Sequence, residues 1–419
     1  MPGRPETLQL LRQRNFRLLL SAQSASVFGD RMFTVALAFA VLDAGGSASA
    51  VGLVLACGMV PLVGSLLIGG VVADRTSRRA VMVSADLVRV ASQGTMAALL
   101  IAGSPALWML GALAAVSGAA TGFFNPASTG LMPAVVSPER LQQANGLRAT
   151  AISGGEILGP LAAGVIVASG GAGWAVAIDA ATFAISAALL LRLRDVARAP
   201  RASSSFLADL KDGWWDFRSR RWLWTLILSV AIGNMVWGAW SALGPVVADR
   251  DLGGAAAWGT VLAALGVGAV AGSVIATRAR PRRPLVWWSL GTFVFGLPLA
   301  FLAAGAPVAL LAGSACLCGA AMMLGNSIWE STLQRHIPDE SLSRVAAYDW
   351  FGSLAFYPLG LAAFGPIAGA IGLGPTLWIA FAVQVATGLA LLAIPDIRNL
   401  PASPAAVELK PLPATERVR

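Results

Sequence analysis

Residues 70–79 read Gly70-Val71-Val72-Ala73-Asp74-Arg75-Thr76-Ser77-Arg78-Arg79. This charged stretch separates two long apolar runs, residues 48–73 and 80–102. Each run can cross the membrane as a helix, because a span of about 30 Å of hydrocarbon needs ~20 mainly apolar residues. The arginines favour one membrane surface, Asp74 can accept hydrogen bonds from a helix N-terminus or an arginine, and Gly70 permits close helix contact. The stretch predicts a tight turn between two membrane-spanning helices.

The whole chain has the composition of a membrane protein. Of its 419 residues 57% are hydrophobic and only 12% are charged, and its mean hydropathy is +0.72. This is more apolar surface than one water-soluble core can hide. The apolar runs predict twelve spans, near residues 16–42, 48–73, 80–102, 106–125, 142–169, 173–193, 222–247, 255–276, 285–304, 307–328, 346–370 and 374–394.

The connections between these spans alternate in charge. The odd-numbered connections are very short, and Arg250 is their one basic residue, whereas the even-numbered connections and the termini hold almost all other arginines. Because basic residues stay on the cytoplasmic side, both termini are predicted to be cytoplasmic and the number of spans even. The arginine-, alanine- and glycine-rich composition suggests a GC-rich bacterium, so we expect a multi-pass protein of the bacterial inner membrane. We find no credible cleavage site for a signal peptide.

The longest connection divides the chain into two groups of six spans. We predict an N-terminal bundle at residues 1–193, a cytoplasmic linker at 194–221, a C-terminal bundle at 222–395 and a disordered tail at 396–419. In the linker, four apolar residues at helical spacing predict an amphipathic helix on the membrane surface, the alternative being a loosely ordered linker. They are Phe206, Leu210, Trp214 and Phe217.

A weak internal repeat supports two related halves. At an offset of 201 residues the matching pairs are Asn125 and Asn326, Leu141 and Leu342, Gly159 and Gly360, and Gly164 and Gly365. Parallel repeats of this kind are typical of transporters with a substrate site between the halves. The predicted fold class is an all-α membrane protein of about twelve transmembrane helices in two pseudo-symmetric six-helix bundles.

Residues 70–79 resemble the signature loop of the major facilitator superfamily, G-x-L-A-D-R-x-G-R-R, with Ser77 in place of the usual glycine. The resemblance implies the fold of that family. It also implies a conformational latch between the two halves, formed by Gly70, Asp74, Arg75, Arg78 and Arg79. The equivalent loop of the second half, residues 277–283, keeps the positive charge and lacks the acidic residue, so any latch there would be degenerate.

Residues 155–164 resemble a second motif of the same family, G-x-x-x-G-P-x-x-G-G, which is associated with antiporters. Gly155, Gly159, Pro160 and Gly164 match, and Ala163 replaces one glycine. Small residues four apart allow tight packing, and proline bends a helix. Shorter stretches at residues 28–31, 86–89, 125–145 and 334–338 resemble the branch that contains macrolide efflux pumps and the enterobactin exporter. These resemblances favour export over uptake.

Ionisable side chains inside the predicted spans are candidates for function, because each costs at least ~2.5–3.5 kcal/mol at mid-membrane. Those that we single out are Asp30, Arg31, Asp86, Arg89, Glu156 and Asp179, with Glu330 and Asp349 near a cytoplasmic end. Asp86 and Arg89 lie three apart on one helical face and are expected to pair. Asp179, near the outer end of its span, is expected to meet water and to act as a cap or gate contact.

Asp30 and Arg31 point about 100° apart around a helix, so one is expected to face the central cavity and the other a neighbouring helix. Glu156 lies near mid-depth with no cation close in sequence. Our hypothesis is that Glu156 or Asp30 carries a coupling proton, and the alternative is an acid hydrogen-bonded at a helix interface. In the seventh span Asn234, Trp237 and Trp240 share roughly one face and are candidates to line the cavity, although tryptophan also anchors helices at interfaces.

The sequence has no motif of an enzyme, a cofactor site or a metal site, and its three cysteines lack the spacing of zinc ligands. Its basic residues lie in loops rather than in a nucleic-acid-binding domain. We therefore expect a monomeric exporter of small amphipathic molecules that works by proton antiport, with its substrate, protons and membrane lipid as its partners. The alternatives are an uptake carrier for an organic solute or lipid, and a transporter-like receptor that moves nothing.

Overall fold

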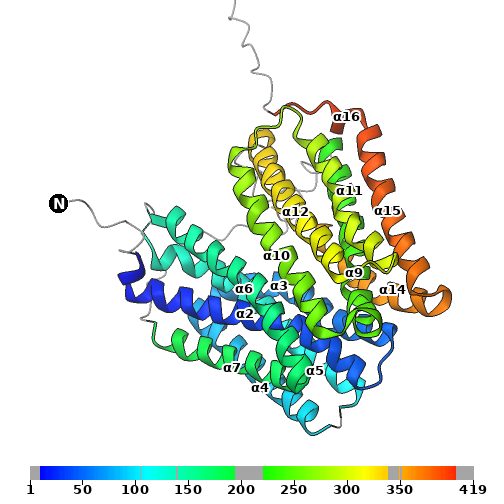
Figure 1. Ribbon diagram of the computed structural model, residues 1–419. Coiled ribbons are helices and arrows are strands. Elements are labelled where there is room, and N and C mark those ends of the chain that lie inside the picture. Colours follow the sequence, from blue (N-terminus) through cyan, green and yellow to red (C-terminus); the bar gives the residue numbers. More distant parts are fainter. Residues whose placement is uncertain are drawn as a thin grey trace, which may run out of the picture.

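The computed structural model describes residues 10–103, 105–137, 140–193, 220–337, 349 and 352–402, without the side chains of Leu67, Asp74, Pro133 and Gln142. The first six long helices are α2 (Arg14–Asp43), α3 (Ala48–Arg75), α4 (Arg78–Ile101), α5 (Leu107–Val135), α6 (Leu141–Gly170) and α7 (Ala172–Leu191). The second six are α9 (Arg221–Val247), α10 (Ala255–Arg278), α11 (Pro284–Ala303), α12 (Val308–His336), α14 (Tyr357–Ile371) and α15 (Leu373–Ala393). Each six form a bundle (Figure 1).

Within the described residues, eleven helices are long and apolar enough to cross a membrane. The remaining long helix, α4, is less apolar because it contains Asp86, Arg89, Ser92 and Gln93, all of which are buried. Since α4 packs against α5 and α7, these polar groups lie inside the first bundle. With α4 the described helices make the predicted twelve.

The two bundles meet along two helix pairs, α6 with α10 and α14 with α3. A Cβ added at Gly164 of α6 would lie only 2.7 Å from the carbonyl oxygen of Ala255, and one at Gly365 of α14 only 2.7 Å from that of Ala48. These two glycines therefore allow the backbones of the two halves to touch. They are also one of the repeated sequence pairs, so the same contact occurs twice in the molecule.

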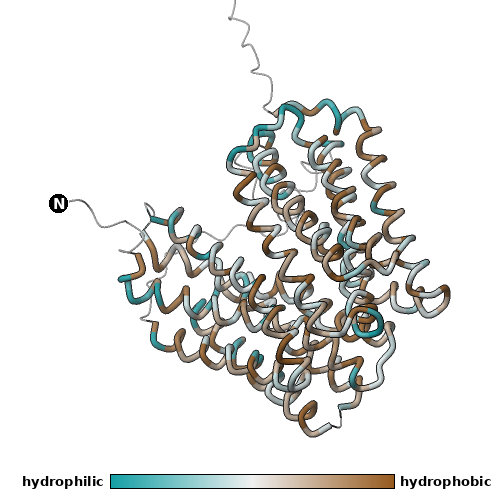
Figure 2. The backbone as a smooth tube through the Cα atoms, viewed as in Figure 1, coloured by the Kyte–Doolittle hydropathy of each residue, from teal (hydrophilic) through white to brown (hydrophobic). Residues whose placement is uncertain are grey.

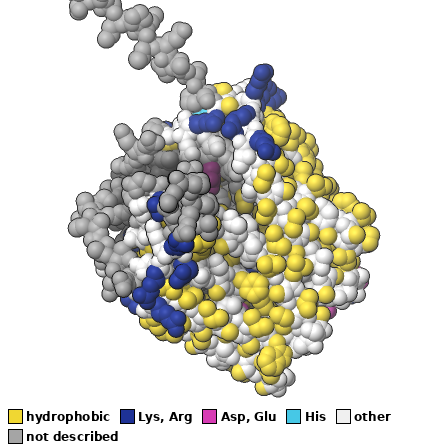
Figure 3. All heavy atoms as spheres, turned by 60° about the vertical axis from the view of Figure 1, so that its left-hand side comes forward, with side chains coloured by type: hydrophobic (Ala, Val, Ile, Leu, Met, Phe, Trp, Pro, Cys, Tyr) yellow, Lys and Arg dark blue, Asp and Glu magenta, His cyan; other side chains and the backbone are white. Residues whose placement is uncertain are grey.

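These contacts lie at the helix ends that the short odd-numbered connections join. Toward the other ends, where the arginine-rich connections lie, the two bundles diverge (Figure 1). Hydrophilic residues gather at the helix ends (Figure 2), and Lys and Arg side chains lie at the rims of the molecule beside a broad apolar surface (Figure 3). On the predicted orientation, this is a conformation open toward the cytoplasm.

Two predictions of element bounds need correction. The spans predicted at 106–125 and 307–328 are too short, because α5 and α12 continue to Val135 and His336; both bounds of α12 are those of α5 shifted by 201 residues, as the repeat requires. The tail does not begin at 396, because residues 395–398 form the short helix α16 (Pro395–Arg398) with Ile397 fully buried. The predicted linker helix lies outside the described residues.

Candidate functional site

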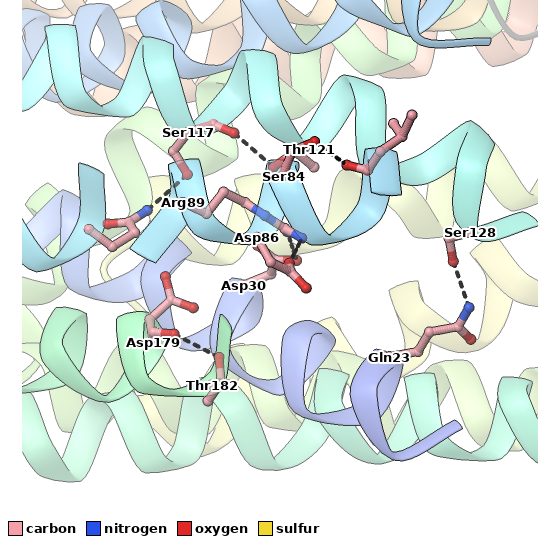
Figure 4. Close-up of polar contacts among 12 residues, drawn as sticks. Gln23, Asp30, Ser84, Asp86, Arg89, Ser117, Thr121, Ser128, Asp179 and Thr182 are labelled. Atoms are coloured by element: carbon pink, nitrogen blue, oxygen red, sulfur yellow. Dashed lines mark hydrogen bonds and ion pairs between the residues drawn. The ribbon is translucent and has the colours of Figure 1, made fainter. Parts of the chain in front are cut away.

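A deeply buried polar site lies inside the first bundle, around Arg89 of α4 (Figure 4). Arg89 is 1% exposed; its Nη2 donates a hydrogen bond to Oδ1 of Asp86, and its Nη1 lies 3.6 Å from Oδ2 of Asp30 on α2. The guanidinium also lies 4.3 Å from the ring centre of Phe124 and 4.1 Å from that of Phe183, close enough for cation–π attraction. The predicted pairing of Asp86 with Arg89 is confirmed.

Asp179 of α7 completes this group. It is fully buried, and neither carboxylate oxygen has a hydrogen-bond partner among the described residues. It interacts electrostatically with Asp30 and Arg89, and a Cβ on Gly29 of α2 would collide with its Oδ1. The expectation that Asp179 meets water near the outer end was wrong. It lies about 10 Å into its helix and is sealed by the close approach of α2.

The resulting acid cluster, which comprises Asp30, Asp86 and Asp179 around Arg89, places three carboxyl groups beside one guanidinium. Fully ionised, it would carry an excess of two negative charges, with Asp86, Asp179 and Arg89 buried and Asp30 40% exposed. Burying uncompensated charge is costly, so proton uptake at a carboxyl stabilises the cluster. The arrangement is chemically suited to bind and release protons. Within the described residues, no group of three His, Cys, Asp or Glu side chains is arranged to hold a metal ion.

The other side of α2 presents a second ion pair. Nη2 of Arg31 lies 2.9 Å from Oε1 of Glu156 on α6, and the two side chains are 48% and 27% exposed. Arg31 also interacts electrostatically with Tyr357 of the second bundle, whose hydroxyl is 3.1 Å from Oγ of Ser241. The pair therefore lies on the side of α2 that is turned toward the second bundle.

In the structure Asp30 and Arg31 point to different neighbours: Asp30 toward α4, and Arg31 toward α6 and the second bundle. This arrangement also supplies Glu156 with the cation that was not evident in the sequence, because Arg31 comes from another helix. A further polar chain was missed. Nε of Arg148 donates to Oε1 of Gln23, and Nε2 of Gln23 donates to Oγ of Ser128. Arg148 lies within the predicted span 142–169, which was the available signal.

The arginines of the predicted latch contact helix ends within their own bundle. Arg78 donates to the carbonyl of Gly130, and Nε of Arg79 lies 2.9 Å from the carbonyl oxygen of Leu190 at the end of α7. A basic residue there complements the negative end of the helix dipole. A Cβ on Gly70 would meet nothing within 4 Å in this conformation, and it is Gly69 that approaches α5 closely. Arg75 is exposed, and the side chain of Asp74 lies outside the described part.

The antiporter-like motif lies on both faces of α6. Gly155 and Gly159 pack against α2, where a Cβ at Gly159 would lie 3.0 Å from the carbonyl oxygen of Phe28. Gly164 and the carbonyl of Pro160 pack against Gly259 of α10 in the other bundle. The motif therefore joins the helix that carries Asp30 and Arg31 to the contact between the two halves.

The predicted cavity face of the seventh span is mainly a packing face, which corrects the assignment of Trp240. Trp240 is 1% exposed, and its ring centre lies 4.6 Å from that of Trp258 and 5.7 Å from that of Trp237. Trp237 is partly buried, and Nδ2 of Asn234 donates to the carbonyl oxygen of Ser353 at 2.8 Å. The i, i+3, i+6 spacing placed the three side chains on one face of α9 but could not show whether that face packs against other helices or lines the cavity.

Sequence comparisons identify several relatives along most of the chain. Multidrug efflux pump Tap of Mycolicibacterium fortuitum is 27% identical over 406 residues, covering 91% of this chain and 96% of the relative. Tap of Mycobacterium tuberculosis is 27% identical, covering 93% of this chain and 95% of the relative. The uncharacterized MFS-type transporter YkuC of Bacillus subtilis is 29% identical, covering 69% of this chain and 70% of the relative.

Solved structures share the fold at low sequence identity. The nucleoside transporter NupG has a TM-score of 0.69 at 16% identity, with coverage of 90% of this chain and 98% of that one. A POT family transporter in complex with 5-aminolevulinic acid has a TM-score of 0.74 at 12% identity, with coverage of 91% and 96%. The family model described as Major Facilitator Superfamily matches residues 19–355. The chain is therefore a multi-pass membrane transporter of the Major Facilitator Superfamily.

Proposed function

We propose that this transporter exports small amphipathic molecules and uses the proton gradient to drive them out. The similarity to Tap, named as a multidrug efflux pump, and the antiporter-like motif of α6 support the direction and the class of cargo. We further propose that it works as a monomer in the bacterial inner membrane, with both termini and the linker at 194–221 on the cytoplasmic side. The arginine-rich connections support this orientation.

The observation that carries the proposal is the acid cluster in the first bundle. Two of its three carboxyl groups, those of Asp86 and Asp179, are fully buried, and the third, that of Asp30, is 40% exposed. A carrier without proton coupling gains nothing from burying these acids around one arginine, because the arrangement lowers stability unless protons neutralise it. One proton that moves down ~100 mV releases ~2.3 kcal/mol, and each pH unit adds ~1.4 kcal/mol. One proton per cargo molecule is therefore sufficient for a concentration ratio of several hundredfold.

Helix α2 links the cluster to the opening between the bundles. Asp30 approaches Arg89 on one side of α2, and the next residue, Arg31, binds Glu156 on the other. A proton on Asp30 weakens its attraction to Arg89, which frees α2 to shift. That shift moves Arg31 relative to Glu156 and Tyr357, and so changes the surface that a cargo molecule meets. Glu156, Asp30 and Asp179 are the carboxyl groups that we propose as proton carriers.

The test begins in pump-deficient cells that express the chain, with accumulation of a macrolide, a dye and a siderophore measured with and without a protonophore. Export predicts lower accumulation, which the protonophore restores. Purified protein in liposomes then separates coupling from binding. We expect Glu156→Gln, Asp30→Asn or Asp179→Asn to abolish export driven by a pH gradient while exchange of labelled for unlabelled cargo continues.

Asp249→Asn is the matched control, because Asp249 is an exposed acid at the opposite end of the molecule from the arginine-rich connections. It should leave both activities unchanged. If all three amide variants export cargo at the wild-type rate under a pH gradient, none of these carboxyls couples transport to protons. Accumulation that rises when the chain is expressed would instead indicate uptake.

A further inference from the structure

The degenerate latch loop of the second bundle borders a cavity with a different chemistry. This cavity, of about 280 Å³, lies between the connection from α10 to α11 and the last turns of α12. We call it the basic pocket. Its polar lining residues are Arg280, Arg282, Arg335, Ser327, Ser331 and Thr332. Among the described lining residues none is acidic, so three guanidinium groups face the space without a carboxylate.

The hydrogen bonds of these arginines leave donors available. Nη1 of Arg280 donates to the carbonyl oxygens of Thr277 and Ala279, and Nη1 of Arg335 donates to that of Ala402. Arg282 has no hydrogen-bond or ion-pair partner among the described residues. An arginine offers five N–H donors in a fork that matches the oxygens of a phosphate, and the serine hydroxyls can add further hydrogen bonds.

The surroundings of the pocket favour a lipid as the source of the phosphate. The pocket lies at the arginine-rich end of α10, one turn from Val274 and Ile275, whose side chains are 54% and 52% exposed. Exposed apolar side chains directly next to an anion site match a molecule that has a charged head and hydrocarbon chains. Basic pockets between membrane helices on the cytoplasmic side are suited to anionic headgroups.

We propose that the basic pocket binds the phosphate of an anionic phospholipid from the cytoplasmic leaflet. The loop at residues 277–283 has no counterpart of Asp74, and this difference accounts for the anion site. In the first bundle the loop contains Asp74 beside its arginines, whereas in the second the arginines are left to bind an external anion. The headgroup would tie the ends of α10, α11 and α12 to the membrane surface. This proposal does not depend on the direction of transport or on proton coupling.

The test compares two double variants of the purified full-length protein by native mass spectrometry. Arg280→Gln/Arg282→Gln removes two pocket arginines. Arg278→Gln/Arg283→Gln removes the same charge from the same connection at two residues that do not line the pocket. We expect the pocket variant to bind phosphatidylglycerol at least about tenfold more weakly than the wild type, the effect of one lost charge-assisted hydrogen bond. The control should change by less than about threefold.

Two further arms identify the ligand. Ser331→Phe fills the pocket and keeps every charge, and it should also weaken phosphatidylglycerol binding. Phosphatidylcholine should bind weakly to all forms, and inorganic phosphate should not displace phosphatidylglycerol from the wild type. Equal losses in the two double variants would show a diffuse charge effect and overturn the proposal. Phosphate binding without lipid retention would overturn the assignment to a lipid.

Discussion

We expect the stability of the first bundle to depend on the side chain of Arg89. It is the guanidinium at the centre of the acid cluster, in contact with the rings of Phe124 and Phe183. We expect Arg89→Leu to destabilise the protein by about 3–5 kcal/mol, because it leaves buried carboxyls without a counter-charge. Adding Asp86→Asn should restore part of that loss, as measured by thermal unfolding in detergent.

Arg250→Leu is the control variant for Arg89→Leu. Arg250 pairs with Asp251 at the surface, with side chains that are 69% and 44% exposed, and such a pair contributes little to stability. Equal losses for Arg89→Leu and Arg250→Leu would mean that the cluster is not an electrostatic unit.

Ser77 explains a departure from the family pattern. Its hydroxyl oxygen accepts a hydrogen bond from the backbone N–H of Ala80 at 3.3 Å, so it caps the N-terminus of α4. The signature loop that residues 70–79 resemble has glycine at this position. We expect Ser77→Ala to cost about 1 kcal/mol of stability and Ser77→Gly only a few tenths, because glycine is itself a good cap. Thermal unfolding would contradict this interpretation if glycine proved more costly than alanine.

At the residue scale, the sequence identified the charged participants but not their partners. The local pair Asp86 and Arg89 followed from spacing within one helix. Asp30, Phe124 and Phe183 come from three other helices, and their approach to Arg89 depends on helix rotations that periodicity does not specify. Asp179 was misplaced for the same reason: its distance from the span end was readable, whereas the close contact with Gly29 was not.

At the scale of elements, α6 and α14 play equivalent roles in the two halves. Gly159 and Gly360 pack on the first helix of their own bundle, and Gly164 and Gly365 pack on the second helix of the other bundle. Sequence analysis found these pairs through the repeat, since small residues leave a readable pattern. It set the ends of α5 and α12 too early, because their last turns contain polar residues that a hydropathy criterion rejects.

The glycine contacts are testable as an outer gate. Gly164→Val places a side chain against the backbone of Ala255, which should separate α6 from α10 and favour opening at the end predicted to face outward. In a variant with the native cysteines replaced by alanine, we expect faster labelling of Ser49→Cys by a membrane-impermeant maleimide. Ser49 lies at the other contact between the halves, beside Gly365.

Gly154→Val is the control on the same helix, because a Cβ at Gly154 would meet nothing within 4 Å. It should leave the labelling rate close to that of the parent. Faster labelling in both variants would show a general loosening of the fold and not a specific gate.

At the scale of the whole molecule, the acid cluster and the glycine contacts should be parts of one motion. The bundles touch at one end and diverge at the other, so closing the open end must separate the closed one if each bundle moves as a rigid unit. On the proposed proton coupling, protonation neutralises the cluster, so acidification should shift the balance between the two conformations.

Spin labels can measure both ends of this motion in the cysteine-free protein. Arg75→Cys and Arg278→Cys report on the arginine-rich end, and Ala102→Cys and Arg250→Cys on the opposite end; each pair has one exposed site in each bundle. Pulsed electron paramagnetic resonance measures the distance between the two labels of each pair. Between about pH 8 and about pH 5.5, we expect the distance at the arginine-rich end and the distance at the opposite end to change in opposite directions. Asp179→Asn should weaken the pH response of both distances, because it removes one of the proposed proton carriers. Distances that change in the same direction would indicate swelling, and a full response in Asp179→Asn would place the proton sensor elsewhere in the molecule.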